Sequence, residues 1–254
     1  MASVRTHALA LESAALVHGL PVKSVPARVI TVRPGGGRSR RHGEELALSG
    51  PLPEHHVITV DGQLVTTRAR TVVDLTRVRG LEAGLIAWDA ARWSARRDRA
   101  LAIFDDQTDE VLELLARRHG IGRAREARWL SSAFSESPME TRSLFAMRAL
   151  GIPEPQQQYE VLTPDGQSLG FADFGWEDEG VLGEYDGDGK YGHLARPGET
   201  PFEVMRREKR RQEAMEAQGW VFARWGKEEL ALPYLLRQRI TSAFEIASGR
   251  RRAG

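Results

Sequence analysis

The sequence predicts a mixed α/β (α+β) protein, in which a small mixed and helical N-terminal domain precedes a C-terminal mixed sheet flanked by helices. Short segments such as 156–162 and 168–176 alternate between apolar and polar residues, which is typical of strands. Longer segments such as 202–218 have helical composition and end at a glycine. A strong helix start after a polar stretch at 131–136 places the boundary between domains 1–132 and 133–254.

The first domain combines a few strands with many helical segments. Asp61-Gly62 is a hairpin turn, and Thr66 or Thr67 can cap the helix that follows. Gly120 and Gly122 mark a break between later helices. The predicted elements are a helix over 8–18, a strand over 28–33, a hairpin over 56–65, helices over 68–78 and 81–93, and two or three helical pieces within 94–132.

The second domain has the order α-β-β-β-α-β-α. Ser137, Pro138 and Glu140 form a helix start with a capping residue, a proline in the first turn and a capping-box glutamate. The predicted elements are helices over 137–150, 202–218 and 227–247, and strands over 156–162, 168–176, 181–186 and 220–225.

Composition limits the class of protein. The chain has 254 residues, of which 41% are hydrophobic and 28% charged, so it can form one large domain or two small ones. It contains no cysteine, which excludes disulfides and thiolate metal sites. With no apolar run long enough to span a bilayer and no signal-peptide pattern, we expect a cytoplasmic protein without membrane partners.

Three carboxylates on the hairpin of residues 171–187 are the most informative feature. If the acidic turn 177–180 closes symmetrically, Asp173 and Glu184 become direct cross-strand neighbours, with Cβ atoms about 4.5–5.5 Å apart. Asp186 follows Glu184 by two residues and shares its face of the strand. Like charges at this spacing repel unless a cation or a proton lies among them. The pattern predicts a site for a divalent metal, whereas a solvated acidic hairpin is the plain alternative.

Such a metal site could act on phosphodiesters. Mg²⁺ or Mn²⁺ held by Asp173, Glu184 and Asp186 would lower the pKa of a bound water, and Glu140 could add an outer carboxylate. Lys190 follows on a glycine-rich turn and could orient that water or neutralise developing charge. Gly35-Gly36-Gly37 lacks the closing residues of a phosphate-binding loop, and we expect no small-molecule cofactor.

Charge distribution makes DNA the expected partner. The formal net charge is only +1, but basic residues cluster near the predicted metal site. Contacts to backbone phosphates are predicted for Arg206, Arg207, Lys209, Arg210 and Arg211. The plain alternative is that this run forms a solvated helix face.

The second domain resembles the PD-(D/E)XK nucleases, in the very-short-patch-repair-like branch called DUF559. The blocks that carry the resemblance span about residues 137–230 and are Ser137-Pro138-x-Glu140, Ala172-Asp173-Phe174-x-Trp176, Glu184-Tyr185-Asp186-Gly187-x-x-Lys190-Tyr191, Glu208-Lys209-x-Arg211 and Gly219-Trp220-Val221-x-x-Arg224-Trp225. The resemblance implies a restriction-endonuclease-like fold and metal-dependent phosphodiesterase ancestry. By residue, it implies metal binding by Asp173 and Glu184, assisted by Glu140.

One departure from the family bears on catalysis. Active members usually carry a lysine two positions after the second acid, where this chain has Asp186. Either Lys190 or Lys209 has taken the role of that lysine, or the site binds metal without cutting.

The first domain resembles the C-terminal region of AbiEi-type antitoxins of type IV toxin–antitoxin systems. The matching blocks lie within about residues 8–93 and are Glu12-Ser13-Ala14-Ala15-x-x-His18-Gly19-Leu20-Pro21, Val65-Thr66-Thr67-x-x-Arg70-Thr71-Val72-x-Asp74-Leu75 and Asp89-Ala90-Ala91. Related chains usually begin with a winged helix. Because Met1 lies only a few residues before the first block, we expect this chain to lack that element.

Three functional hypotheses follow. The first is a Mg²⁺-dependent endonuclease-like protein that hydrolyses DNA. The second is a non-catalytic antitoxin or transcriptional regulator with a degenerate nuclease fold, which binds DNA, a toxin or another protein. The third is a second domain that serves only as a protein-interaction module.

Overall fold

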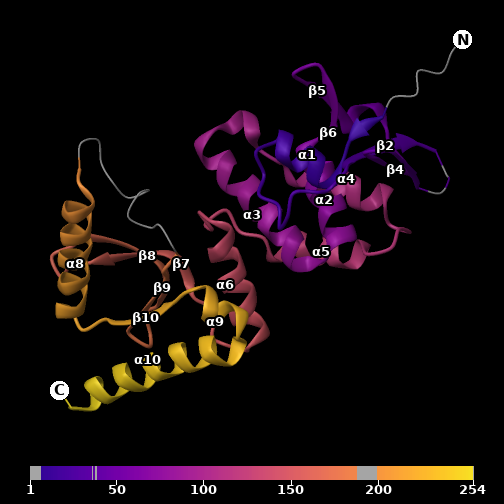
Figure 1. The fold of residues 1–254 in the computed structure, drawn as a ribbon. Coiled ribbons are helices and arrows are strands. Elements are labelled where there is room, and N and C mark those ends of the chain that lie inside the picture. The colour runs from indigo at the N-terminus through magenta and orange to yellow at the C-terminus, as the bar shows by residue number, and fades with distance from the viewer. Residues whose placement is uncertain (1–6, 36, 38, 188–198, 254) are drawn as a thin grey trace, which may run out of the picture. The chain divides into compact units, whose positions relative to one another are not determined.

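The computed structural model describes residues 7–35, 37, 39–187 and 199–253. Within them the chain is a mixed α/β protein with nine α-helices and two mixed sheets, one of six strands and one of four. It divides into two compact units, residues 1–138 and 139–254 (Figure 1). The unit boundary lies six residues after the predicted domain boundary (138 − 132), at the start of a helix. The predicted fold class is confirmed.

The first unit contains the six-stranded sheet, in the order β3-β4-β2-β1-β6-β5. Its strands are β1 (Ala8–Leu9), β2 (Val29–Pro34), β3 (Arg40–His42), β4 (Glu45–Gly50), β5 (Val57–Val60) and β6 (Gln63–Thr66). Its helices are α1 (Leu11–Val17), α2 (Arg68–Arg79), α3 (Leu81–Arg97), α4 (Asp105–Leu114) and α5 (Ile121–Leu130). The predicted hairpin is β5–β6, and Thr67 caps α2 by accepting from the N–H of Arg70.

A buried helix pair forms the centre of the first unit. Trp88 of α3 is fully buried and donates from Nε1 to Thr76 of α2, at 3.0 Å. Gly84 lets the helices approach, because a Cβ at this position would lie 2.1 Å from the Thr76 hydroxyl. Three differences from prediction concern short strands: β3 and β4 were not expected, and Ala8–Leu9 extends the sheet instead of opening the first helix.

The second unit contains the four-stranded sheet, in the order β10-β9-β8-β7. Its elements are α6 (Pro138–Ala149), β7 (Gln156–Leu162), β8 (Ser168–Trp176), β9 (Val181–Tyr185), α8 (Pro201–Ala217), β10 (Val221–Trp225), α9 (Lys227–Ala231) and α10 (Pro233–Ala253). The strands β7, β8 and β9 are antiparallel neighbours, and β10 is parallel to β9. The single predicted last helix is in fact two, because Pro233 starts a new helix.

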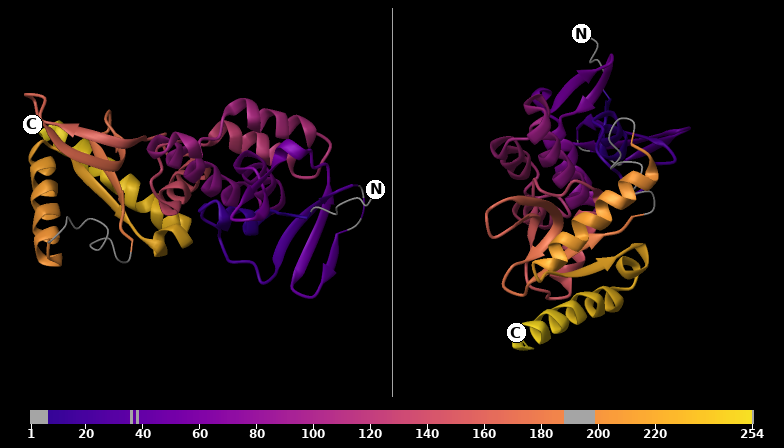
Figure 2. Two further views of the ribbon diagram at one scale, coloured as in Figure 1. Left: turned by 90° about the horizontal axis from the view of Figure 1, so that it is seen from above. Right: turned by 90° about the vertical axis from the view of Figure 1, so that its left-hand side faces the viewer.

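Helices cover both faces of this sheet. On one face Phe174, Trp176 and Trp225 pack against α6 and α10. On the other face Leu182 and Tyr159 pack against Met215 of α8. The right-hand view of Figure 2 shows β10 running between α8 and α10. One face of the sheet is therefore covered by α8, and the candidate site lies on that face.

Candidate functional site

The hairpin β8–β9 has the predicted register. Its pairs are Phe174 with Gly183, Gly175 with Leu182 and Trp176 with Val181, and the turn closes by a hydrogen bond from the Gly180 N–H to the Glu177 carbonyl. The same register places Asp173 opposite Glu184, one position beyond the last pair. Asp173 holds the two strands together at this point, because its Oδ2 accepts from the backbone N–H of Tyr185 at 2.8 Å.

The neighbouring strands extend this register into a polar row across the sheet. Arg224 of β10 pairs directly with Glu184. On β7, Gln158 lies between the pairs Gln157–Phe174 and Tyr159–Ala172, so its position is opposite Asp173. We call this set the polar row: Gln158, Asp173, Glu184 and Arg224.

Gln158 has an unusual backbone in this row. Its φ of 50° lies in the left-handed region, which is uncommon for a glutamine and costs conformational energy. Its side chain donates from Nε2 to Oε2 of Glu140 at 3.2 Å. Glu140 is buried on α6, so this bond ties the helix carboxylate to the strand beside Asp173. Sequence reasoning missed Gln158, and nothing in its local sequence marks it.

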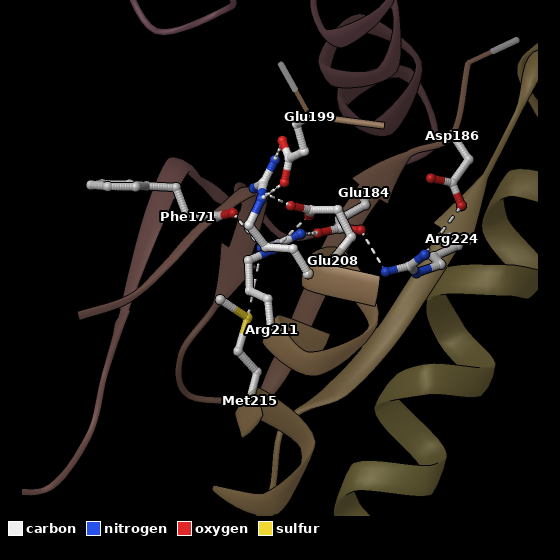
Figure 3. Close-up of polar contacts among 9 residues, drawn as sticks. Phe171, Glu184, Asp186, Glu199, Glu208, Arg211, Met215 and Arg224 are labelled. Atoms are coloured by element: carbon white, nitrogen blue, oxygen red, sulfur yellow. Dashed lines mark hydrogen bonds and ion pairs between the residues drawn. The ribbon is translucent and has the colours of Figure 1, made fainter. Parts of the chain in front are cut away.

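Glu184 is the most buried carboxylate of the row, with only 3% of its side chain exposed. Its Oε1 accepts from Arg211 of α8 at 2.7 Å, and its Oε2 lies 2.7 Å from Nη2 of Arg224 (Figure 3). Two guanidinium groups therefore supply the counter-charge that a buried carboxylate needs. Arg224 is the only charged residue in its strand, which is the signal that could have revealed its role.

The pairs continue into a network of alternating charge. Arg224 also approaches Asp186 at 3.6 Å, so Asp186 and Glu184 share a face as predicted. Arg211 binds Glu208 at 2.9 Å, and Arg207 binds both Glu208 and Glu199. The network thus contains, in order, Glu199, Arg207, Glu208, Arg211, Glu184, Arg224 and Asp186, all of which except Arg207 are labelled in Figure 3. Burial works to lower the pKa of Arg211, but Glu184 and Glu208 outweigh it and raise that pKa.

The predicted phosphate contacts fall into two groups. Arg207 and Arg211 lie inside the network. Arg206, Lys209 and Arg210 lie on the exposed face of α8, where Arg206 stacks over Phe202 and Lys209 approaches Glu213 at 3.8 Å. Lys190 lies outside the described residues.

One set of three potential metal ligands with atoms within 4.8 Å of one another occurs in the described residues: His55, His56 and Glu110, in the first unit. Nδ1 of His56 lies 3.3 Å from Nη1 of Arg70, which can only donate, so Nδ1 carries the lone pair and Nε2 the proton. Nε2 is the atom that faces Glu110, at 3.5 Å. This tautomer does not suit metal binding.

The ligand atoms of the predicted acidic residues lie farther apart than those of His55, His56 and Glu110. Among the described residues, no three of Asp173, Glu184, Asp186 and Glu140 bring ligand atoms within 4.8 Å. The arrangement is a carboxylate pair, Asp173 and Glu184, flanked by arginines on one side and by the bonded Glu140 and Gln158 on the other. Metal binding by these residues stays a prediction.

Comparisons with known proteins are sparse. No family model matches the chain, and no solved structure matches it. Two proteins of Mycobacterium tuberculosis, described as uncharacterized protein Rv2248 and uncharacterized protein MT2308, are each 32% identical to it over 127 residues. The matched region is 50% of this chain and 44% of each relative, so the chain spans less than half of their length. Separately, no helix in the described ranges has the length and hydropathy needed to cross a bilayer.

Proposed function

We propose that the second unit is a metal-dependent, endonuclease-like module that acts on DNA phosphodiester bonds. The observation that carries this proposal is the placement of Asp173 opposite Glu184 where β8 leaves β9. An arginine-rich helix, α8, packs over the same face of the sheet. The donor set is made of oxygens, which suits Mg²⁺ or Mn²⁺.

Each residue has a distinct part in this proposal. Asp173 and Glu184 hold the metal, and Glu140, oriented by Gln158, supports it from α6. The bound metal would lower the pKa of a water and stabilise charge on the phosphoryl oxygen. Orienting the water is the role proposed for Lys190, which lies outside the described residues. Arg206, Lys209 and Arg210 attract backbone phosphates.

A second candidate function is a non-catalytic regulator or antitoxin-type protein that binds DNA or a protein partner. The observation that favours it is the arginine pairing of Glu184, whose two oxygens each face a guanidinium. Asp186 also pairs with Arg224, at the position where active members of the resembled family carry lysine. In this alternative the network stabilises the fold, and the first unit supplies the protein-binding surface.

A nuclease assay separates the two functions. Single-stranded, nicked and mismatched duplex DNA are incubated with and without Mn²⁺, using the wild type, Asp173→Asn and Glu184→Gln. Glu160→Gln, at an exposed position of β7, is the matched control. Mn²⁺-dependent cutting that both site variants lose supports the enzyme. DNA binding without cutting by the wild type supports the regulator, and cutting that survives in both variants contradicts the assigned site.

A further inference from the structure

The side chain of Arg211 is held in place by three hydrogen bonds to oxygen atoms. Its Nη1 donates to the Phe171 carbonyl at 2.8 Å, its Nη2 to Glu184 at 2.7 Å and its Nε to Glu208 at 2.9 Å. Its stem covers Gly170, where a Cβ would lie 3.2 Å from the Arg211 Cδ. Because Nε, Nη1 and Nη2 each donate to an oxygen, the guanidinium has a defined position and orientation.

That position is the opening between two strands. β8 pairs with β7 as far as Ser168, but with β9 only from Phe174 to Trp176. Before Phe174, β8 has left β9, and Arg211 links the Phe171 carbonyl of β8 to the Glu184 carboxylate of β9 (Figure 3). A cation thus already lies on Glu184, one of the two carboxylates that would hold the proposed metal.

The network brings several carboxylates close together. Glu184, Asp186, Glu199 and Glu208 are its carboxylates, and Arg207, Arg211 and Arg224 are the guanidinium groups that bind them. Asp173 and Glu140 lie beside this network and are acidic as well. A divalent cation is attracted to clustered carboxylates, but Glu184 can accept it on Oε1 only if Arg211 moves away, because Arg211 already donates to that atom.

Resting on the proposed function, we propose that Arg211 is the resident cation of this site, which metal displaces from Glu184 and which a DNA phosphate then binds. The exchange satisfies both partners, because the metal takes the carboxylate and the phosphate takes the guanidinium. A phosphate that draws Arg211 away makes Glu184 available to the metal. Metal and DNA therefore strengthen each other's binding, and by linkage the factor is the same in both directions.

Calorimetry tests this coupling. Mn²⁺ is titrated into the wild type and Arg211→Met, alone and with a short phosphorothioate duplex that resists hydrolysis. The wild type binds Mn²⁺ at least ~5-fold more tightly when the duplex is present, a factor at the low end of typical coupling. Arg211→Met binds Mn²⁺ more tightly than the wild type without DNA, and the duplex no longer changes that affinity.

Two further variants control for folding and for general loss of charge. Arg239→Met removes a cation of the same unit that lies outside the network, on α10, where Arg239 binds Glu229, and it keeps the coupling. Arg211→Lys keeps the charge but lacks the planar guanidinium, so it should give an intermediate coupling. It replaces Arg211→Met in the test if that variant does not fold.

The outcomes separate this inference from the proposed function. If the wild type binds Mn²⁺ in an Asp173-dependent manner but Arg211→Met shows the same affinity and the same coupling, the resident-cation role is wrong and the metal site stands. If no variant binds Mn²⁺ with or without the duplex, the metal site and the role of Arg211 are both overturned.

Discussion

Glu184 of β9 and Arg211 of α8 are joined by a hydrogen bond of 2.7 Å, although 27 positions separate them in the chain. This bond connects the centre of the sheet to the helix that covers it. Because Arg224 faces the other oxygen of Glu184, one buried carboxylate links three elements, β9, β10 and α8. Whatever its chemical role, Glu184 is therefore also a structural residue.

The first prediction concerns the stability of this junction. Glu184→Gln removes the charge that both arginines face, and it should lower the free energy of unfolding by about 1–3 kcal/mol. The value stays in this range because Arg211 and Arg224 are partly exposed, at 21% and 37%, and water screens them. Urea unfolding measures the change. Glu160→Gln, exposed on β7, should change the free energy by less than about 0.5 kcal/mol, and equal effects of both variants would contradict the structural role.

The second prediction uses the left-handed backbone of Gln158. At an ordinary strand position, glycine is less stable than alanine by roughly 0.5–1 kcal/mol. At Gln158, with φ at 50°, the order should reverse, and Gln158→Gly should be more stable than Gln158→Ala by about 1 kcal/mol.

The same strand supplies the control for this comparison. Glu160 lies in β7 at a position without positive φ, so Glu160→Ala should be more stable than Glu160→Gly. Chemical denaturation of the four variants gives both differences. A Gln158→Gly protein that is less stable than Gln158→Ala would mean that this residue does not adopt the left-handed conformation.

The limits of β7 and β8 are the predicted ones, because apolar alternation and the turn Pro164-Asp165-Gly166 determine both strands locally. The register of the hairpin β8–β9 is the predicted one, since the length of the hairpin loop determines it, and its extension by one position places Asp173 opposite Glu184. These features depend on residues that are close in sequence, so the local sequence pattern predicts them.

Other features depend on distant contacts. Nothing about a glutamine favours positive φ, so Gln158 takes this conformation only because the surrounding sheet and α6 impose it. The basic run on α8 predicts a charged helix, but it does not reveal that Arg211 turns inward to Glu184 while Arg210 stays exposed. Likewise, β1 and β3 are too short for a periodic signal, and pairing with β2 and β4 defines them.

The third prediction concerns pH and the first unit. Burial lowers the pKa of His18 below its ordinary value of 6.5, and burial together with Arg70 lowers that of His56. The unfolded chain therefore binds protons at these histidines more readily than the folded chain does. Stability should fall as pH drops below 6.5, and it should be restored as pH rises.

Thermal unfolding followed from about pH 8 to about pH 5 checks this dependence. The double variant His18→Gln, His56→Gln should lose part of the slope below the unfolded-state pKa, because it removes both proton-binding groups. The glutamine oxygen at position 56 can still accept from Arg70. A slope in the double variant equal to that of the wild type would show that other groups cause the pH dependence.

The last prediction concerns DNA binding by α8. Arg206, Lys209 and Arg210 are exposed on the helix, whereas Arg207 binds Glu199 and Glu208. Each exposed cation that contacts a phosphate releases a counterion, so Arg206→Ala or Arg210→Ala should reduce the slope of log K against log salt by about 0.9. Fluorescence anisotropy with a labelled duplex at several salt concentrations measures the slope.

Arg207→Ala is the control for this prediction, and it should change the slope less, because two carboxylates already neutralise that side chain. If Arg207→Ala has the largest effect, the network around Glu184, and not the exposed face of α8, is the surface that binds DNA.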